Sequence, residues 1–338
     1  MKLKTKSNYQ FHKIAFHTGL DLARPTFIWF KPTYRCNSKC SMCTIWRKGS
    51  KYQELSTQQW KDILLDVRKW LGRVWVGFQG GEVFLRNDMI EILRYASDIE
   101  LATEAISNGL LIDRGLAKNI IDCGLTELRI SLDGIRPETH NFIRNVEGGY
   151  EKVISAIEYL NELKEEKKQP RIVIQSIIMG YNIDEILNLV RFTQEKHLSG
   201  IYFQPLEQNI EEEEDVKWYE GSELWPKEDK FHKVVEVIDE LIRMKRRGLP
   251  IINTIQHLEA MKPYFFDPEG LYRKAKSQTL TVKGNICTAS LTNFIVYPDG
   301  SLKNCHGMEP IGNLTLESAK TLWKNRYKCW KKGCPLKR

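Results

Sequence analysis

The segment CNSKCSMC, from Cys36 to Cys43, places three cysteines close together in the chain. Three thiolates can hold three irons of a [4Fe–4S] cube, whereas the usual full set of ligands is four. The spacing of Cys36, Cys40 and Cys43 therefore suits an iron–sulfur cluster whose fourth iron is open for chemistry. A structural zinc site is the alternative for such a group of thiolates.

The start of the chain indicates the compartment in which these thiols work. Its first residues, MKLKTKSNYQ, are polar and include no apolar core of a signal peptide. Disulfides are rare in reducing compartments, so we expect a cytoplasmic protein with reduced cysteines. The longest apolar runs, such as Ile172 to Met179, are far too short to cross a bilayer, so no membrane span is predicted.

The bulk composition indicates a globular protein of ordinary character. A chain of 338 residues, with 42% hydrophobic and 28% charged residues, predicts one large domain with an appendage. The formal net charge of +8 is moderate, but Lys324 to Arg338 contains seven Lys or Arg residues and no acidic residue. Such a patch could receive an acidic redox partner or a phosphate-bearing substrate. No nucleic-acid-binding motif surrounds it, and we expect no nucleic-acid partner.

Short β-branched or aromatic runs alternate with longer helical patterns from Phe27 onward, which is typical of βαβ units on a parallel sheet. The expected strands are Phe27 to Phe30, Val74 to Gln79, Thr103 to Ser107, Glu127 to Leu132, Arg171 to Met179 and Gly200 to Gln204. Six strands are too few for a closed eight-stranded barrel.

Capping residues mark several of the helices between these strands. Ser56 with Gln59 predicts a capping box that opens a helix through Trp70, and Asn182 with Glu185 predicts a similar start for Ile183 to Lys196. Asp113 predicts a further helix start. The amphipathic pattern from Glu151 to Lys168 predicts another helix.

An acidic stretch from Glu207 to Asp229 interrupts this rhythm. A charge run of this kind is typical of a solvated loop, and the alternative is a lid over a substrate cleft. A helix from about Phe231 to Arg247 is expected after it.

Chemically distinctive residues follow four of the expected strands directly. The three cysteines follow the first strand, and Gly80, Gly81 and Glu82 follow the second. Asn108 ends the third strand, and Ser131 ends the fourth. Ligands of barrel and open α/β sheets gather at the carboxyl ends of the strands, so these residues are expected to share one site.

These residues resemble the radical S-adenosylmethionine (radical SAM) superfamily. The cysteine spacing C-x3-C-x2-C after the first strand is similar to that family's cluster motif, and Gly80-Gly81-Glu82 resembles its methionine-binding GGE. The resemblance implies an α/β fold, with a partial (β/α)6 TIM-like barrel over residues 25–206.

The family resemblance also implies the cofactors and their ligands. Cys36, Cys40 and Cys43 would bind a [4Fe–4S] cluster whose open iron chelates S-adenosylmethionine, with a reducing donor such as flavodoxin or ferredoxin. The residues implied as contacts of S-adenosylmethionine are Met42, Gly80, Gly81, Glu82, Asn108, Ser131, Arg144 and Gln204. No catalytic acid or base is identified.

The cysteine-rich tail resembles the SPASM/Twitch extension of one branch of that superfamily. It contains FIVYPDGSLKNC, which ends at Cys305, and a turn at Pro298-Asp299-Gly300 predicts a β-hairpin there. The resemblance implies an auxiliary [4Fe–4S] cluster, or zinc as the alternative, held by Cys287, Cys305, Cys329 and Cys334. The predicted division of the chain is 1–24 as an N-terminal segment, 25–206 as the barrel, 207–284 as a connecting region and 285–338 as the cysteine-rich β-hairpin/helix extension.

The resemblance implies a radical SAM enzyme that oxidises or rearranges a small-molecule or carbohydrate-type substrate. A peptide- or protein-modifying maturase is the alternative. It is disfavoured because such enzymes usually have a leader-recognition domain ahead of the barrel, and 35 residues precede Cys36 here. A non-enzymatic, zinc-bound scaffold is the third hypothesis.

Overall fold

The computed structural model describes residues 24–25, 27–164, 169–208, 217–269, 292–304 and 309–331. The chain divides into two compact units. Unit 1 comprises Met1–Arg35, Lys48–Glu104 and Lys274–Arg338, and unit 2 comprises Cys36–Arg47 and Ala105–Arg273. Strand β3 (Ala102–Ser107) crosses the boundary between them along the chain.

The described part of unit 1 contains five complete strands, in the order β2-β1-β7-β8-β9. These are β1 (Phe27–Phe30), β2 (Trp75–Phe78), β7 (Asn293–Val296), β8 (Ser301–Lys303) and β9 (Gly312–Asn313). Strand β1 pairs in parallel with β2 and with β7. Strands β7 and β8 form the predicted antiparallel hairpin, and Gly300 has a φ of 83° in its turn, a conformation that favours glycine. The sequence did not predict that β7 lies beside β1.

The described helices of unit 1 are α2 (Thr57–Leu71), α3 (Met89–Asp98) and α12 (Ala319–Lys331), with the 3-10 turns η2 (Gly49–Lys51) and η3 (Val83–Leu85). The predicted capping box at Ser56 and Gln59 is confirmed. The buried Trp60 of α2 packs edge-on against Phe30 of β1, with the ring centroids 5.8 Å apart. Trp70 packs against Trp323 of α12 and Phe294 of β7, at centroid distances of 6.2 and 6.1 Å. These aromatic contacts join α12 to the core of unit 1.

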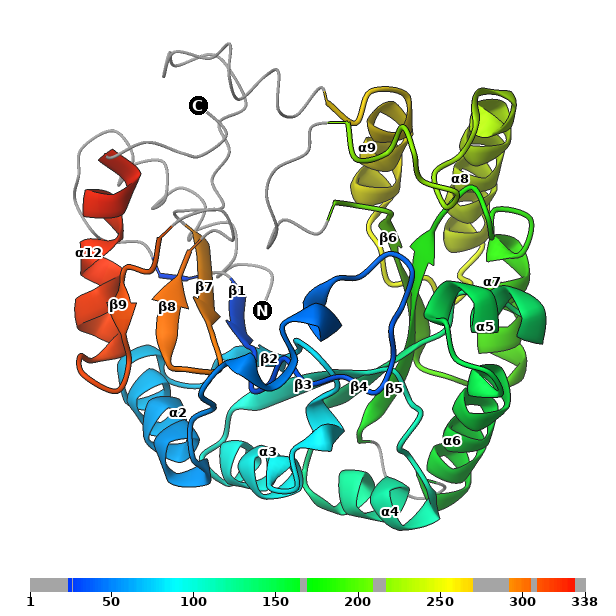
Figure 1. Ribbon diagram of the computed structural model, residues 1–338. Coiled ribbons are helices and arrows are strands. Elements are labelled where there is room, and N and C mark those ends of the chain that lie inside the picture. The colour runs from blue at the N-terminus through cyan, green and yellow to red at the C-terminus, as the bar shows by residue number, and fades with distance from the viewer. Residues whose placement is uncertain are drawn as a thin grey trace. The chain divides into compact units, whose positions relative to one another are not determined.

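Unit 2 contains the complete parallel strands β4 (Glu127–Ser131), β5 (Arg171–Ile178) and β6 (Gly200–Pro205), in the order β6-β5-β4. Its helices are α4 (Arg114–Asp122), α5 (Pro137–Arg144), α6 (Gly149–Lys164), α7 (Ile186–Glu195), α8 (Phe231–Arg246) and α9 (Ile255–Phe266), and its 3-10 turns are η1 (Ile45–Arg47) and η4 (Glu228–Lys230). Figure 1 shows α4 beside α6, and α8 beside α9. The alternation of strands and helices confirms the predicted α/β class with parallel pairing.

The local predictions in unit 2 have mixed outcomes. The Asp113 side chain accepts a hydrogen bond from the Leu116 amide at 2.7 Å, so the predicted cap of α4 is confirmed. The predicted cap at Asn182 is wrong, because α7 begins at Ile186. The Asn182 amide instead donates to the carbonyl groups of Asp133 and Ile177, at 2.7 and 2.8 Å. A tertiary contact has replaced the local cap.

Glu185 has also been recruited into a tertiary contact. Its side chain is 4% exposed and accepts hydrogen bonds from the amides of Ile135 and Arg136, the Arg136 guanidinium and the Thr139 hydroxyl. Burial opposes the charged form, but the hydrogen bonds from Thr139 and Arg136 prevail and lower the pKa of Glu185. This carboxylate therefore fixes the start of α5.

We expect Glu185→Gln to lower the free energy of unfolding by roughly 1–3 kcal/mol, because a buried charged acceptor is replaced by a neutral one. Since the folded-state pKa is lowered, the stabilisation is complete above the ordinary value of 4.5 and declines as the pH falls below it. Urea unfolding at neutral and acidic pH measures both effects. Glu162→Gln, which removes an exposed pair with Arg114, is the control and should change stability much less than Glu185→Gln does. Equal effects of the two variants would contradict the assignment.

Candidate functional site

The loop Cys36–Arg47, called the cysteine loop below, belongs to unit 2 and contains the three predicted cluster ligands. Cys36, Cys40 and Cys43 are reduced cysteines that form no disulfide, and Cys40 is buried. The Cys43 amide donates to the Cys40 carbonyl at 3.1 Å, and the Trp46 indole donates to the Cys43 carbonyl at 2.7 Å. The first bond closes a turn between the second and third cysteines, and the second fixes the Trp46 ring after the third cysteine.

The cysteine loop is anchored to the last turn of α5. The final carbonyls of a helix have no partner within the helix. Here the Ser38 hydroxyl donates to the Arg144 carbonyl at 2.8 Å, and the Ser41 amide donates to the Ile143 carbonyl at 2.9 Å. The end of α5 and the shape of the loop therefore depend on each other.

Arg144 extends from the same helix end toward Cys40. Its guanidinium forms an ion pair with Asp133 at 2.6 Å, and its other terminal nitrogen lies 3.9 Å from the Cys40 sulfur. The Arg144 side chain is 13% exposed, and that of Asp133 is fully buried. Burial alone would lower the pKa of Arg144, but the Asp133 carboxylate and the Cys40 sulfur raise it above its usual range. Arg144 is therefore a permanent cation beside a predicted cluster ligand.

Asp133 is held from several sides at the end of β4. Its carboxylate accepts from the Ile177 amide at 2.8 Å, and its own amide donates to the Nδ1 atom of His140 at 3.3 Å. Burial, with a smaller contribution from Arg144, lowers the pKa of His140 to about 3. His140 is therefore neutral near pH 7 and accepts a hydrogen bond there.

Other predicted site residues of unit 2 also lie at strand ends. The Asn108 amide donates to Asn37 at 2.7 Å and lies 3.9 Å from the Cys36 sulfur. Gln204 accepts from Gln175 at 2.9 Å, at the end of β6. Ser131 is buried at the last position of β4, and Met42 is half-buried in the cysteine loop. The structure thus joins Asn108 and Arg144 to the cysteine loop, whereas Gln204 is bonded to the neighbouring strand.

The predicted Gly-Gly-Glu segment lies in unit 1, directly after β2. The Gly81 amide donates to the Thr33 carbonyl at 2.9 Å, and the Glu82 amide donates to the Arg35 carbonyl at 2.8 Å. Gly80 has a φ of 139°, and a Cβ on it would lie 2.6 Å from the Thr33 oxygen. A Cβ on Gly81 would lie 2.7 Å from the Arg35 carbonyl carbon. Only glycine permits this backbone approach.

Glu54 supports the same stretch of backbone. It forms an ion pair with Arg35 at 3.1 Å and accepts from the Thr33 hydroxyl. The buried Arg86 donates to the Pro32 carbonyl at 3.2 Å and forms an ion pair with Glu54 at 3.4 Å. The chain that leads into the cysteine loop is therefore fixed by charged hydrogen bonds.

The donor set of the cysteine loop fits an iron–sulfur cluster. Three reduced thiols are available, and N–H groups of Arg144 and Asn108 lie beside two of their sulfur atoms. Hydrogen bonds to ligand sulfurs are a usual feature of such clusters. Within the described residues, no group of three or more His, Cys, Asp or Glu side chains is arranged to hold a single metal ion. The ligands of one cube bind different irons and so are spaced more widely than those of one ion.

The predicted auxiliary ligands are largely outside the described residues. This applies to Cys287, Cys305 and Cys334, while Cys329 lies in α12 with only its backbone described. The acidic run at 211–215 also lies outside them. Cys123, which the motifs did not use, is buried at the end of α4.

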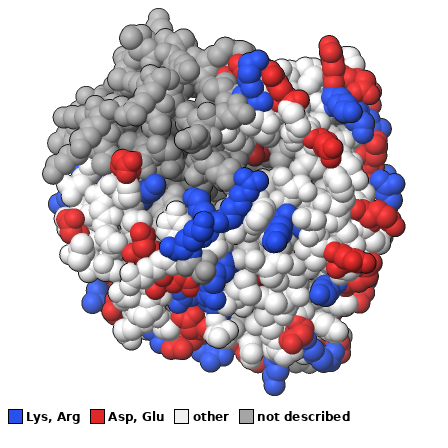
Figure 2. Space-filling view, in the orientation of Figure 1, with Lys and Arg blue, Asp and Glu red and all other residues white. Residues whose placement is uncertain are grey.

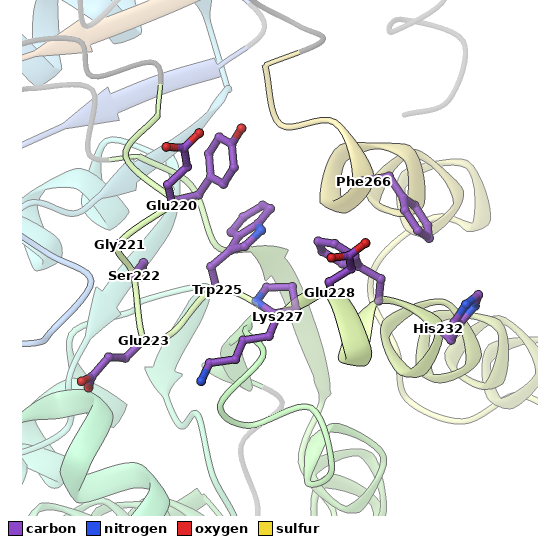
Figure 3. A pocket seen from close by; sticks show the side chains of 12 residues that line it. Glu220, Gly221, Ser222, Glu223, Trp225, Lys227, Glu228, His232 and Phe266 are labelled. Atoms are coloured by element: carbon purple, nitrogen blue, oxygen red, sulfur yellow. The ribbon is translucent and has the colours of Figure 1, made fainter.

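Unit 2 also contains an open groove of about 840 Å³ between the segment 219–228, the start of α8 and the end of α9. Its aromatic wall includes the half-buried Tyr219 and the buried Trp225, and Phe266 is 53% exposed at its other side (Figure 3). The exposed carboxylates of Glu223 and Glu228 lie along it. We call it the aromatic groove.

Tertiary contacts place the aromatic groove at the carboxyl ends of β5 and β6. The Gly180 amide, just after β5, donates to the Leu224 carbonyl at 2.8 Å, and a Cβ on Gly180 would lie 2.6 Å from the Pro226 nitrogen. The Tyr264 hydroxyl of α9 donates to the Leu206 carbonyl, just after β6, at 2.8 Å. Barrel enzymes build their sites at this edge of the sheet. The sequence signal was the aromatic-rich segment after the acidic run, which the motifs did not use.

The outer surface of the cysteine loop is basic and aromatic. Lys39 and Arg47 are exposed, and each lies over the Trp46 ring, at 5.6 and 5.4 Å from its centroid. Figure 2 shows Lys and Arg side chains gathered on the face over this part of the chain, which is blue in Figure 1.

No helix of the described chain is long and apolar enough to cross a membrane.

The loop with the three thiols follows the first strand of the parallel βα series, which is the position expected for the predicted cluster motif. Residues 30–193 of the chain match the family model described as the radical SAM superfamily. This part of the chain is therefore similar to the domain that defines the radical SAM superfamily.

Relatives of the chain act on different substrates. The chain is 31% identical over 181 residues to the Fe-coproporphyrin III synthase of Methanosarcina barkeri, which covers 53% of this chain and 43% of that protein. It is 29% identical over 143 residues to the PqqA peptide cyclase of Rhodopseudomonas palustris, covering 41% of this chain and 37% of that protein. Each match spans less than half of the relative's length.

A solved structure confirms the fold over almost the whole chain. The structure of Streptococcus suis SuiB bound to the precursor peptide SuiA has a TM-score of 0.67 and 17% identity, covering 99% of this chain and 71% of that one. The fold is a partial TIM-like barrel with an open sheet and a C-terminal extension, as predicted. The names of two of these proteins, the PqqA peptide cyclase and SuiB bound to its precursor peptide, include peptides.

We expect Gly81→Ala to lower the free energy of unfolding by roughly 1–3 kcal/mol, because the new methyl group collides with the Arg35 carbonyl and separates two hydrogen-bonded backbones. Urea unfolding measures the effect. Gly115→Ala is the control, because its Cβ finds ordinary contact in α4 and should not reduce stability. A Gly81→Ala protein as stable as this control would show that the close approach is not required.

Proposed function

We propose that the protein is a radical SAM enzyme that modifies a peptide. The observation that carries the proposal is the combination of the three-thiol loop with an open aromatic groove at the carboxyl ends of β5 and β6. The names of the PqqA cyclase and of the SuiB–SuiA complex support the peptide part of the proposal. The resemblance to SPASM-type tails supports it further.

The proposed cofactors are a [4Fe–4S] cluster on Cys36, Cys40 and Cys43, with S-adenosylmethionine. When bound, they supply a 5′-deoxyadenosyl radical that abstracts hydrogen from the substrate. The chain holds and orients them, and it excludes water from the site. The residues proposed to contact S-adenosylmethionine are Met42, Gly80, Gly81, Glu82, Asn108, Ser131, Arg144 and Gln204.

The geometry of the segment after β2 supports particular roles for the glycine pair and for Glu82. The Gly81 and Glu82 amides donate to the Thr33 and Arg35 carbonyls, so the proposed contribution of Gly80 and Gly81 is to let these two backbone segments approach closely beside the ligand. The Glu82 carboxylate accepts from the Phe84 amide at 3.2 Å and is buried, so its proposed contribution is to hold this turn.

An auxiliary [4Fe–4S] cluster on Cys287, Cys305, Cys329 and Cys334 remains part of the proposal. The hairpin β7–β8 ends two residues before Cys305, and α12 contains Cys329, in the order that the resemblance implies. Its proposed role is to accept or relay an electron during substrate oxidation.

The proposed substrate site is the aromatic groove. Its volume of about 840 Å³ lies within the range of about 300–1,000 Å³ that ligand sites usually occupy. Its open form and exposed Phe266 suit an extended chain with apolar side chains. The carboxylates of Glu220, Glu223 and Glu228 outnumber the Lys227 ammonium in its lining, which favours a segment that also carries positive charge.

The proposed electron donor is an acidic protein such as a flavodoxin or ferredoxin. The exposed Lys39 and Arg47 on the cysteine loop provide complementary charge for it. Reduced thiols and a low-potential donor suit a cytoplasmic location, which is part of the same proposal.

We expect Cys40→Ala to reduce iron content after anaerobic reconstitution and to abolish reductive formation of 5′-deoxyadenosine, because one of three cluster ligands is lost. Cys123→Ala is the control, because the Cys123 thiol is buried at the end of α4. This variant should keep both its iron content and the formation of 5′-deoxyadenosine. Metal analysis and chromatography provide the two measurements. Zinc in place of iron and sulfide in the unaltered protein would support the scaffold hypothesis instead.

We expect peptides from short reading frames beside the gene to be altered in mass by the reconstituted enzyme, with S-adenosylmethionine and a reductant. Phe266→Ala should raise the KM for such a peptide by roughly tenfold, because one aromatic contact is removed, and should leave substrate-free 5′-deoxyadenosine formation unchanged. Tyr52→Ala, at an aromatic of similar exposure in unit 1, is the control. Turnover of an iron porphyrin precursor with no peptide modified would favour the synthase-like function instead.

A further inference from the structure

A buried ion pair lies beside one predicted cluster ligand in unit 2. Asp133 is fully buried and the Arg144 side chain is 13% exposed, at a separation of 2.6 Å. Buried ion pairs contribute little net stability, because desolvation of both charges offsets their attraction. Stability alone therefore does not account for this pair.

The geometry of Arg144 divides its guanidinium between two partners. One terminal nitrogen meets Asp133, and the other lies 3.9 Å from the Cys40 sulfur. The planar guanidinium holds both directions at once, which a lysine would not do. The Arg144 carbonyl accepts from Ser38, whose hydroxyl also lies 3.1 Å from the Cys40 sulfur.

The carboxylate that orients Arg144 is itself fixed. Asp133 accepts from the Ile177 amide of β5, and its carbonyl accepts from the Asn182 side chain. The adjacent His140 is neutral and adds no charge. The buried charges next to the Cys40 sulfur are therefore the Arg144 cation and the Asp133 anion that pairs with it.

We propose that Arg144 and Asp133 are positioning residues that set the reduction potential of the cluster on the cysteine loop, through the guanidinium beside the Cys40 sulfur. Reduction adds one electron, supplied by the donor, to a cluster bound by thiolates. A nearby cation stabilises this added negative charge and raises the potential, while Asp133 limits the increase. The proposal rests on the proposed function, because it requires the cluster to be present.

The test measures the midpoint potential of the reconstituted protein by redox titration followed by electron paramagnetic resonance, without S-adenosylmethionine. Asp133→Asn keeps the guanidinium but removes its counter-charge, so the ratio of reduced to oxidised cluster at a fixed potential should rise. Adding Arg144→Gln in that background leaves no unpaired carboxylate. That second change should lower the ratio about tenfold, which for one electron corresponds to about 59 mV.

Arg136→Gln is the matched control. Arg136 also pairs with a buried carboxylate of unit 2, at 2.6 Å from Glu185, but it has no contact with a cysteine. The cluster of the Arg136→Gln protein should have the same midpoint potential as that of the unaltered protein. The proposal is supported if the midpoint potential rises in Asp133→Asn, falls again when Arg144→Gln is added, and does not change in the control. A packing defect alone would not shift the potential in opposite directions in these two steps.

Several results would overturn it. These are a change of less than about twofold between Asp133→Asn and the double variant, or a loss of S-adenosylmethionine binding in the double variant with no shift in potential. If the double variant holds no iron, the Asp133→Asn variant alone tests the proposal. An unchanged midpoint potential of the Asp133→Asn protein, or a failure of that protein to hold iron, would contradict the proposal. An unaltered protein that holds no cluster would instead refute the proposed function.

Discussion

The buried carboxylate of Asp133 is the constraint on which the described geometry of unit 2 depends. It follows β4 directly, receives a hydrogen bond from the backbone of β5, and balances the arginine at the end of α5. An unpaired charge in that position would be strongly unfavourable, so the strand ends and the helix end can take only a narrow range of relative positions. The loop that bears the cysteines is bonded to this same helix end.

Much of the fold could be predicted because its signals are local. Alternation of apolar runs identified the six parallel strands to within about two residues, and Ser56 and Asp113 cap helices as expected. Asn182 is the instructive failure, since its side chain bonds to Asp133 and not to the amide of its own helix. A capping pattern cannot reveal that a buried partner from another element competes for the same side chain.

The candidate site was predictable in its residue types and not in its contacts. Spacing alone singled out Cys36, Cys40 and Cys43, and the glycine pair stood at a strand end. Arg144 and Cys40 are 104 residues apart in the sequence, so no local pattern predicts their contact. The aromatic groove was missed for the same reason, because its walls come from 219–228 and from α9 and meet only through tertiary packing.

The serine anchors of the cysteine loop bear on how the protein matures. Ser38 and Ser41 lie between the cysteines, and their bonds to α5 use no metal. Most small metal-binding segments must lose conformational entropy when their ligand arrives, which weakens the first binding event. Here the bonds of Ser38 and Ser41 already order the backbone, so the proposed cluster would assemble on a loop that has lost this conformational entropy during folding.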